Sequence, residues 1–389
     1  MNVKGQVILK RGKEQSILRR HPWLFSGAIH KMEGAIADGD WVTVVDAEGV
    51  VLGHGHYQKG SIMVRLLSFE RSAPQANFYT ERISTAARQR ANINIQYTMT
   101  NAYRLVHGEG DGLPGLIVDM YNGVAVVQAH SHGMHADRTM IAEAIKDVFE
   151  ENIIAVYYKN QMGGNTRGEY LLGMSVVPHT ILEHNHKFFV DWEEGQKTGF
   201  FLDQRESRLL LASYAMNRTV LNTFCYTGGF SVYAAQAGAA LVHSVDASER
   251  AVEMTKKNLQ LNGFDPLQHE CYTDDTFDFL KDKKDRYDLI ILDPPAFAKH
   301  KDSKHQAMKG YQRLNLDAIQ KIRSGGIIFT FSCSQVVDRQ LFYDTVVSSA
   351  IQSGREIKVL QHLSQPADHP VSIYHREGEY LKGLVLFVS

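Results

Sequence analysis

From about residue 191 onward, short runs of β-forming residues alternate regularly with segments of helical character. Strands separated by helices predict an α/β fold: a parallel, doubly wound sheet with helices on both of its faces. Such sheets bind their ligands outside the carboxyl ends of the strands. The expected strands, with the turns that follow them, include "TVLNTFCYTGG", "ALVHSVDAS", "QHECYTDD", "YDLIILDPP" and "IIFTFSCS".

Two further modules are predicted ahead of this sheet. Residues 1–72 contain short runs of β-forming residues separated by turns, which predicts a small β-rich domain. Residues 73–190 begin with helical spacing and continue into a hairpin at Asn122-Gly123, which predicts a mixed α+β domain. Because 389 residues are too many for one ordinary core, we expect three domains, at 1–72, 73–190 and 191–389.

The charges of the chain are balanced, with 42 Lys and Arg against 43 Asp and Glu. The field of the whole protein therefore cannot attract a polyanion, and any nucleic-acid surface must be local. Basic stretches from Lys4 to Lys31 and from Ala298 to Arg313 are candidates for such surfaces. No apolar run approaches the roughly 20 residues of a spanning helix, and the N-terminus lacks signal-peptide features. We expect a cytoplasmic protein without a membrane partner.

The cysteines and histidines give little support for a metal centre. Cys225, Cys271 and Cys333 are too few and too widely spaced for a disulfide framework or a CxxC zinc site. The stretch "HSHGMH", residues 130–135, has no second cluster with ligand spacing. It predicts a polar loop, and no metal is expected.

A glycine turn and three acidic residues mark the expected carboxyl ends of the strands. Thr227, Gly228 and Gly229 separate the first strand from its helix, where glycines let a ligand approach a helix N-terminus. Asp246 and Asp275 are expected to close the second and third strands, and Asp293 the fourth, ahead of two prolines. One such acid is usually only a helix N-cap. Three of them behind a glycine turn favour a binding site.

These motifs resemble the class I S-adenosylmethionine-dependent methyltransferases. The stretch "EEGQKTGFFLDQRESR" is more specific, and it resembles the segment that packs over the cofactor in bacterial 23S rRNA (cytosine-5) methyltransferases of the large-subunit methyltransferase I type. The beginning "LKRGKEQSILRRHPWLFSGAI" is similar to the N-terminal PUA domain of that family. "RLVHGEGDGLPGLIVDMY" is similar to its central domain, and "ADHPVSIYHREGEYLKG" matches near its end.

The resemblance implies a reaction, a cofactor and a partner. The cofactor would be S-adenosylmethionine and the substrate a cytosine in 23S rRNA, free or partly assembled into the large subunit. Asp246 would bind the ribose of the cofactor and Asp275 its adenine, and Asp293 would lie between the cofactor and the target base. The full set of expected cofactor contacts is Gln204, Arg205, Thr227, Gly228, Gly229, Asp246, Asp275 and Asp293.

Cys333 has the chemistry that methylation of carbon 5 requires. Carbon 5 of cytosine is a poor nucleophile until a thiolate adds to carbon 6. Cys333 follows an expected strand and is flanked by Ser332 and Ser334. We therefore expect Cys333 and Asp293 to be catalytic, with Asp293 at the edge of the base, and Cys225 and Cys271 to serve packing.

Alternatives stay open at this point. The run "DPPAF" also resembles a motif of exocyclic-amine methyltransferases, in which Phe297 would stack on the base and no cysteine would be needed. A non-catalytic RNA-binding assembly factor is a further alternative. The base that removes the carbon 5 proton is not assigned, although Glu379 and His369 are candidates. The oligomeric state is also open, with a homodimer as one arrangement.

Overall fold

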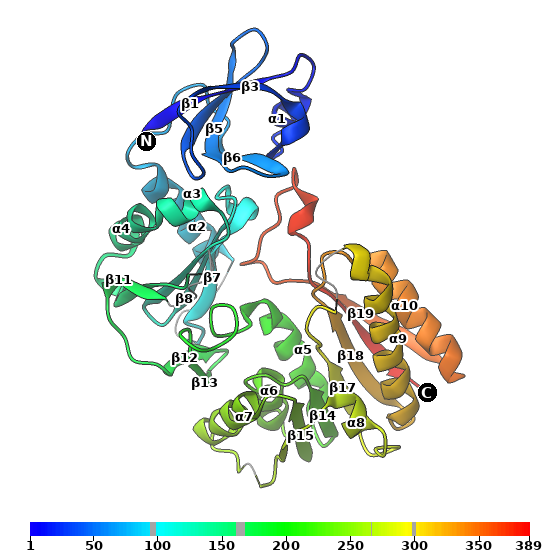
Figure 1. Ribbon diagram of the computed structural model, residues 1–389. Coiled ribbons are helices and arrows are strands. Elements are labelled where there is room, and N and C mark those ends of the chain that lie inside the picture. The colour runs from blue at the N-terminus through cyan, green and yellow to red at the C-terminus, as the bar shows by residue number, and fades with distance from the viewer. Residues whose placement is uncertain (94–98, 161–167, 266, 298–300) are drawn as a thin grey trace. The chain divides into compact units, whose positions relative to one another are not determined.

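The computed structural model describes residues 1–93, 99–160, 168–265, 267–297 and 301–389. The chain forms two compact units, and neither is one continuous stretch (Figure 1). Unit 1 consists of Met1–Ile181, Val190–Phe200 and Ala367–Gly378. Unit 2 consists of Leu182–Phe189, Phe201–Pro366 and Glu379–Ser389.

The first part of unit 1 is a six-stranded sheet with strand order β2-β6-β5-β4-β1-β3. Its core contains alternate residues of the strands, such as Val7 and Leu9 of β1 and Val42 and Val44 of β4, as expected where one face of a sheet is buried. Its elements are β1 (Val3–Leu9), α1 (Gln15–Leu18), β2 (Trp23–Phe25), η1 (Ser26–Ala28), β3 (Ile29–Gly34), β4 (Trp41–Val45), β5 (Val51–Tyr57) and β6 (Ile62–Ser68).

A five-stranded sheet of order β11-β10-β9-β8-β7 forms the second part of unit 1. The predicted hairpin is present, and Asn122 and Gly123 both have positive φ between β8 and β9, as a two-residue turn requires. Its elements are α2 (Phe78–Asn92), β7 (Ala102–His107), η2 (Gly108–Asp111), β8 (Leu116–Tyr121), β9 (Val124–Ala129), α3 (His132–Ala136), α4 (Arg138–Phe149), η3 (Glu150–Asn152), β10 (Ala155–Tyr158) and β11 (Glu169–Gly173). η6 (Arg376–Gly378) also belongs to unit 1. A short pair, β12 (His179–Glu183) and β13 (His186–Val190), follows β11 along the chain, and its residues Leu182–Phe189 are part of unit 2.

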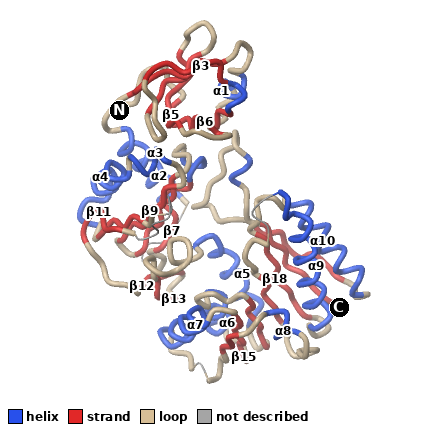
Figure 2. Tube along the Cα trace, in the orientation of Figure 1, coloured by secondary structure: helices blue, strands red, loops and turns tan. Residues whose placement is uncertain are grey.

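Unit 2 contains a seven-stranded sheet of order β16-β15-β14-β17-β18-β20-β19, in which helices cover both faces (Figures 1 and 2). The predicted α/β class is confirmed. The elements are η4 (Leu202–Gln204), α5 (Arg205–Ala215), β14 (Thr219–Thr223), α6 (Gly229–Gln236), β15 (Leu241–Asp246), α7 (Glu249–Leu261), β16 (Cys271–Thr273), α8 (Thr276–Leu280), β17 (Leu289–Leu292), η5 (Lys301–Ser303), α9 (Lys304–Lys321), β18 (Gly326–Ser332), α10 (Arg339–Ser353), β19 (Ile357–Leu363) and β20 (Lys382–Val388).

One strand departs from the predicted parallel arrangement. β20 inserts between β18 and β19 and runs antiparallel to both. A parallel neighbour would need a crossover connection, usually a helix. Residues 364–381, which connect β19 to β20, contain only the single 3₁₀ turn η6. The reversed direction brings the first residue of β20 to the carboxyl end of β18.

None of the described helices combines the length and the apolar character needed to cross a bilayer.

Candidate active site

The register of the sheet in unit 2 brings the predicted strand ends to one edge. Thr223 at the end of β14 pairs with Val245 of β15 on one side and with Leu292 of β17 on the other. Leu292 pairs in turn with Thr330 of β18. The residues that follow these strands therefore emerge together. The chain passes from β14 to β15 and β16 on one side and then to β17 and β18 on the other, so this edge contains the topological switch point where ligands bind.

The glycine turn after β14 is shaped by close neighbours. Gly228 has φ +77°, and a Cβ there would lie 2.6 Å from Cγ2 of Thr255. A Cβ on Gly229 would lie 3.0 Å from Cδ of Arg208. The carbonyl of Thr227 accepts a hydrogen bond of 2.8 Å from Nδ2 of Asn258. The turn thus requires glycine for both backbone conformation and space.

Asp246 lies at the end of β15, as predicted, and fixes the backbone around it. Its Oδ2 accepts from the amide of Tyr226 in the glycine turn, and its Oδ1 accepts from the amide of Ser248, both at 2.9 Å. Each carboxylate oxygen can accept more than one hydrogen bond. The side chain is therefore oriented by the turn and still has the capacity to accept from ribose hydroxyls.

Asp275 lies two residues beyond β16, which ends at Thr273, rather than closing that strand. It is the N-cap of α8, and its Oδ1 accepts from the amides of Phe277 at 2.8 Å and Asp278 at 3.2 Å. The side chain has the capping role that acids commonly take at strand-to-helix turns.

Gln204 and Arg205 are both buried where η4 meets α5, with 2% and 3% of their surface exposed. Oε1 of Gln204 has no hydrogen-bond partner within the described chain. A buried acceptor of this kind costs free energy unless a donor satisfies it, and S-adenosylmethionine carries an ammonium group that could donate to it. This part of unit 2 fits the expected cofactor in its hydrogen-bonding chemistry.

A buried ion pair holds α5 in place beside the glycine turn. Nε and Nη2 of Arg208 donate to the two carboxylate oxygens of Glu183 at 2.8 and 2.7 Å. The hydroxyl of Tyr233 in α6 donates to the same carboxylate at 3.0 Å. Burial alone would raise the pKa of Glu183, but the charge of Arg208 outweighs it and the pKa of this carboxyl is lowered. Arg208 is the last residue of the quoted segment "EEGQKTGFFLDQRESR", whereas Glu183 lies before it and no sequence pattern indicated the pairing.

Asp293 and Cys333 follow neighbouring strands at the carboxyl edge, and both are partly buried. Tyr311 of α9 is buried near them. Burial raises the pKa of Tyr311 to about 12, and negative charge on Cys333 or Asp293 would act in the same direction. The structure thus brings together the two residues that were predicted to be catalytic, with a phenol beside them that the sequence analysis missed.

The other two cysteines have different surroundings. Cys225 is buried in the glycine turn, with its Sγ 3.5 Å from the hydroxyl of Thr255, and burial raises its pKa far above the ordinary range. Burial also raises the pKa of Cys271 to about 11. Both thiols are therefore protonated and unreactive near neutral pH.

Lys382 is a further residue at this edge that the sequence analysis did not single out. It is the first residue of β20, only 3% exposed, and it pairs with Ser332 at the end of β18. Its Nζ donates a hydrogen bond of 2.6 Å to the carbonyl of Ser334. Burial lowers the pKa of Lys382 to about 8, against the opposing effect of a charge on Cys333. The sequence feature that could have indicated a special role for Lys382 is its position as a single lysine at the start of an otherwise apolar strand.

Phe297, the candidate stacking residue of "DPPAF", packs against the protein itself. Its ring centroid lies 4.7 Å from that of Tyr311, and its ring also fills the space beside Gly310 of α9.

The two candidate bases for removing the carbon 5 proton, Glu379 and His369, contact other side chains. Glu379 forms an ion pair of 2.6 Å with Arg339, and His369 belongs to unit 1, where its Nδ1 lies 3.0 Å from Asp368.

The two basic stretches present exposed cations. In unit 1, all seven of the basic side chains from Lys4 to Lys31 are exposed. In unit 2, Lys309 and Arg313 of α9 are exposed, whereas Lys299 and His300 lie outside the described residues. Three of these exposed cations form surface ion pairs: Arg11 with Glu48, Lys31 with Glu33 and Arg313 with Asp317.

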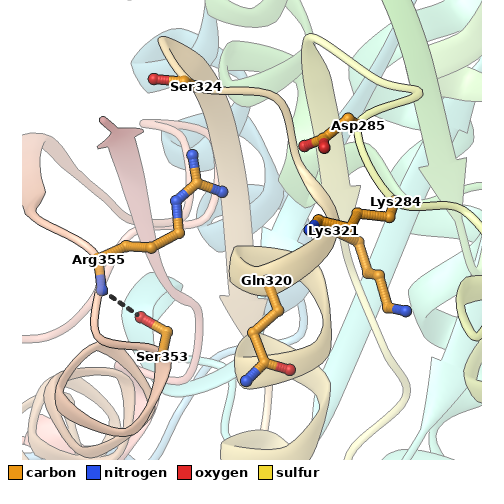
Figure 3. A pocket seen from close by; sticks show the side chains of 7 residues that line it. All are labelled: Lys284, Asp285, Gln320, Lys321, Ser324, Ser353 and Arg355. Atoms are coloured by element: carbon orange, nitrogen blue, oxygen red, sulfur yellow. Dashed lines mark hydrogen bonds between the residues drawn. The ribbon is translucent and has the colours of Figure 1, made fainter.

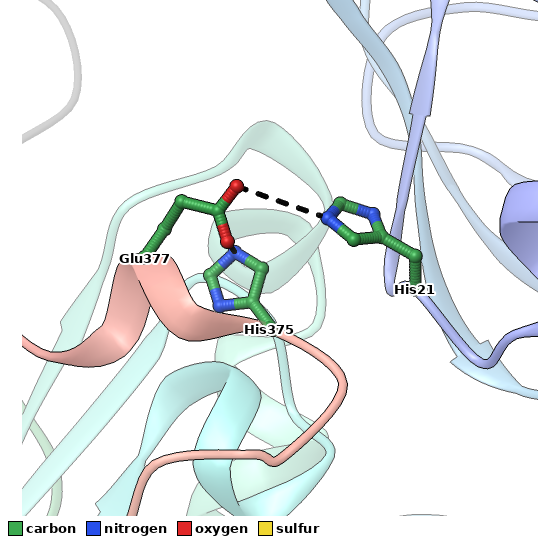
Figure 4. Close-up of side chains that lie close together, drawn as sticks. All are labelled: His21, His375 and Glu377. Carbon is green, nitrogen blue, oxygen red and sulfur yellow. Dashed lines mark ion pairs between the residues drawn. The ribbon is translucent and has the colours of Figure 1, made fainter.

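The histidine-rich stretch 130–135 is not the loop that was expected. His132–Ala136 forms helix α3, because the hydroxyl of Ser131 caps it by accepting from the amide of Met134 at 3.4 Å. A different group of side chains, within the described part of the chain, has the spacing of metal ligands (Figure 4). Nε2 of His21 lies 4.0 Å from one carboxylate oxygen of Glu377, and Nε2 of His375 lies 3.6 Å from the other.

Packing accounts for this second group of side chains. The ring of Trp23 stacks edge-on against His375, with centroids 4.3 Å apart, and Nδ1 of His21 accepts from the amide of Trp23 at 3.2 Å. The absence of a metal stays a prediction.

A pocket of about 550 Å³ lies elsewhere in unit 2 (Figure 3). Asp285 and Ser324, which line it, precede β17 and β18, so the pocket lies at the amino ends of these strands. One of its cations, Arg355, already donates to the carbonyls of Ile319 and Ile322 at the end of α9, both at 2.7 Å. The pocket is separate from the candidate active site.

Comparison with known proteins agrees with this geometry. Residues 7–69 match the model of PUA-like domains, and residues 103–373 match that of S-adenosylmethionine-dependent methyltransferases. A ribosomal RNA large subunit methyltransferase I from Pseudoalteromonas atlantica is 40% identical over 395 residues, which cover 98% of this chain and 99% of that protein. The protein of the same name from Escherichia coli is 38% identical, covering 97% and 98%.

Solved structures show the same fold. A methyltransferase in complex with S-adenosylhomocysteine has a TM-score of 0.85 at 25% identity, covering 98% of this chain and 100% of that one. A second, from Streptococcus mutans, has a TM-score of 0.84 at 24% identity, with the same coverage. The chain therefore belongs to the S-adenosylmethionine-dependent methyltransferases, with S-adenosylmethionine as its cofactor, and within them to the family of ribosomal RNA large subunit methyltransferase I.

Proposed function

We propose that this protein forms 5-methylcytosine in 23S rRNA through a covalent adduct between the sulfur of Cys333 and carbon 6 of the target cytosine. The observation that carries the proposal is the position of Cys333, a partly buried thiol at the carboxyl end of β18, beside the strand end that holds Asp293. The names of the relatives support ribosomal RNA of the large subunit as the substrate. A cytoplasmic location is part of the proposal, whereas the homodimer alternative gains no support from the relatives.

The proposed role of Cys333 is nucleophilic. Its thiolate forms a bond to carbon 6, which gives carbon 5 the nucleophilic character that the free base lacks. When bound, S-adenosylmethionine supplies the methyl group that carbon 5 takes. A base then removes the proton from carbon 5, the bond between sulfur and carbon 6 breaks, and the thiolate of Cys333 is regenerated.

Asp293 and the cofactor-binding residues hold the reacting groups in this scheme. Asp293 binds the edge of the cytosine and stabilises the charge that develops at N3 as the thiolate adds. Asp246 binds the ribose and Asp275 the adenine of the cofactor. The turn of Thr227, Gly228 and Gly229 lets the cofactor approach the backbone, and Gln204 and Arg205 complete the set.

RNA binding is assigned to the two basic stretches. Phosphate neutralisation by exposed Lys and Arg supplies affinity without sequence information. The enzyme must also take the target base out of its stack to reach carbon 5 and carbon 6. We propose that the cations of α9, including Lys309 and Arg313, contact phosphates beside the extruded base, and that residues 1–72 form the PUA-like RNA-binding domain, 73–190 the central domain and 191–389 the methyltransferase domain.

Nucleoside mass spectrometry tests the proposal. Protein-free 23S rRNA from cells lacking the enzyme would be incubated with methyl-labelled cofactor and either the wild-type protein or Cys333→Ala. We expect labelled 5-methylcytosine with the wild-type protein and none with the variant. Cys271→Ala is the matched control, because this thiol is protonated at neutral pH, and it should retain the activity. A labelled amine-methylated purine, or 5-methylcytosine that persists in Cys333→Ala, would overturn the role of Cys333.

A further inference from the structure

Lys382 lies against the backbone of Cys333. The antiparallel pairing of β18 and β20 aligns Lys382 with Ser332, the residue before Cys333. Its Nζ donates to the carbonyl of Ser334, the residue after Cys333, at 2.6 Å. The side chain thus passes from the residue on one side of the cysteine to the residue on the other. An ammonium group has three donors, and this hydrogen bond uses one of them.

A buried lysine without a charged partner is costly, because its ammonium group loses the solvation of water. The acids around Lys382 are occupied by other groups. Glu379 forms an ion pair with Arg339, and Oδ1 of Asp338 caps α10 by accepting from the amide of Leu341 at 2.8 Å. A thiolate on Cys333 would favour the charged form of Lys382, and by reciprocity the ammonium would favour the thiolate.

We infer that Lys382 is a positioning residue that keeps Cys333 ionised and holds the Ser332–Ser334 backbone at the carboxyl end of β18. This inference rests on the proposed function, in which Cys333 is the nucleophile. The thiolate fraction of a cysteine sets how much nucleophile is available at neutral pH. The ammonium of Lys382 would therefore act on the reaction through Cys333, without contacting the RNA base.

The charge of Lys382 can be separated from its hydrogen bond. Lys382→Gln removes the charge and keeps an N–H donor that can reach toward the carbonyl of Ser334, whereas Lys382→Arg keeps both the charge and the donors. Lys358→Gln is the matched control, because Lys358 is an exposed lysine on the neighbouring strand β19. The rate of Cys333 alkylation by iodoacetamide would be measured on the full-length protein from pH 5 to 10, by mass spectrometry of the peptide that contains Cys333.

We expect Lys382→Gln to shift the alkylation profile of Cys333 upward by about one pH unit, which lowers the rate at neutral pH about tenfold. Lys382→Arg should match the wild-type profile below about pH 8, where both side chains are charged, and Lys358→Gln should leave the profile unchanged over the whole range. A profile of Lys382→Gln that coincides with the wild-type profile would overturn the inference. Lys382 would then only hold the backbone in place through its hydrogen bond to Ser334. The Cys225 peptide reports folding, since this buried thiol reacts only if the chain unfolds.

The experiment keeps the two proposals distinguishable. Alkylation needs neither RNA nor cofactor, so the inference about ionisation can fail while Cys333→Ala still abolishes methyl transfer. If Cys333→Ala instead retains methyl transfer, the proposed function fails whatever the alkylation profiles show.

If the Cys225 measurement shows that Lys382→Gln is unfolded, the comparison of Lys382→Arg with the wild-type protein tests the inference instead. A guanidinium stays charged through pH 10, whereas Lys382 deprotonates above about pH 8. Lys382→Arg should therefore keep the enhanced reactivity of Cys333 above that pH, where the wild-type protein loses it. Identical profiles over the whole range would count against the inference.

Discussion

At the scale of single residues, the candidate site depends on charges that are buried together. Glu183 and Arg208 form a bidentate pair behind the glycine turn, and Lys382 lies buried beside Cys333. The sequence could predict Asp246, Asp293 and Cys333 because Asp246 ends a recognisable strand and the other two directly follow one. It could not predict Lys382 or Tyr311, because their positions depend on how β20 and α9 pack, which hydrophobic periodicity does not specify.

We predict that Glu183→Gln destabilises unit 2 by about 3 to 5 kcal/mol, because it leaves the buried charge of Arg208 unpaired. Urea unfolding followed by the fluorescence of a reporter placed in unit 2 would measure the loss. Glu253→Gln is the control within the same unit, since Glu253 pairs with Lys256 at the surface and its loss should cost far less stability. Equal losses in the two variants would contradict the assignment.

The same pair gives a pH dependence of defined sign. The pKa of Glu183 is lowered in the folded protein, so its contribution to stability is present above the pKa of an unfolded glutamate. That contribution disappears as the pH falls through the folded pKa. The wild-type protein should therefore lose more stability than Glu183→Gln on acidification below about pH 4.

At the scale of elements, the glycine turn between β14 and α6 has two separate requirements. Gly228 needs a positive φ, and it also needs the absence of a Cβ next to Thr255. Gly238 has nearly the same φ, +81°, but no atom of the described residues lies within 4 Å of the position that its Cβ would take. The two glycines therefore separate backbone strain from steric clash.

We predict that Gly228→Ala weakens cofactor binding and costs about 1 to 3 kcal/mol more stability than Gly238→Ala. Isothermal titration with S-adenosylhomocysteine and thermal unfolding would measure the two effects. Thr255→Ser removes the Cγ2 that the new methyl group would meet, so combining it with Gly228→Ala should recover part of the loss. If Gly228→Ala and Gly238→Ala lose the same stability and the same cofactor affinity, the clash with Thr255 contributes nothing measurable to either.

The order of elements in unit 2 was largely predictable, whereas the direction of one strand was not. Alternating strand and helix patterns predict parallel strands, and six of the seven strands in this sheet, β14 to β19, run in the same direction. The run "YLKGLVLFVS" predicts a strand, but its pattern does not indicate whether that strand is parallel or antiparallel to its neighbours. Its antiparallel course follows from the connection between β19 and β20, residues 364–381, which contains no crossover helix.

At the scale of the whole molecule, the net charge of −1 makes RNA binding depend on local cations. In residues 4–31 the exposed cations include Arg19 and Arg20. Each phosphate that a Lys or Arg neutralises releases counterions, so affinity falls as salt rises. A protein with balanced charge gains no comparable long-range attraction.

We predict that RNA binding weakens steeply between 50 and 200 mM salt, conditions over which counterion release is readily measured. The double variant Arg19→Gln and Arg20→Gln should reduce the slope of log affinity against log salt by about one for each residue. Lys146→Gln with Lys358→Gln, two exposed lysines outside both basic stretches, should leave the slope unchanged. Fluorescence anisotropy with a labelled rRNA fragment would measure it, and a flat salt response of the wild-type protein would refute the assignment.

The insertion of β20 between β18 and β19 also has a consequence for folding. Among the described strands, β19 pairs with β20 alone, so it cannot join the sheet until β20 has paired with β18. Ser332 and Lys382 are far apart along the chain, and contacts between distant residues form late because the loop must close first. Until that step Cys333 is an ordinary thiol without its ammonium neighbour. The reactivity of Cys333 should therefore rise only when folding of the sheet is complete. In partly folded chains the thiol of the proposed nucleophile should react slowly.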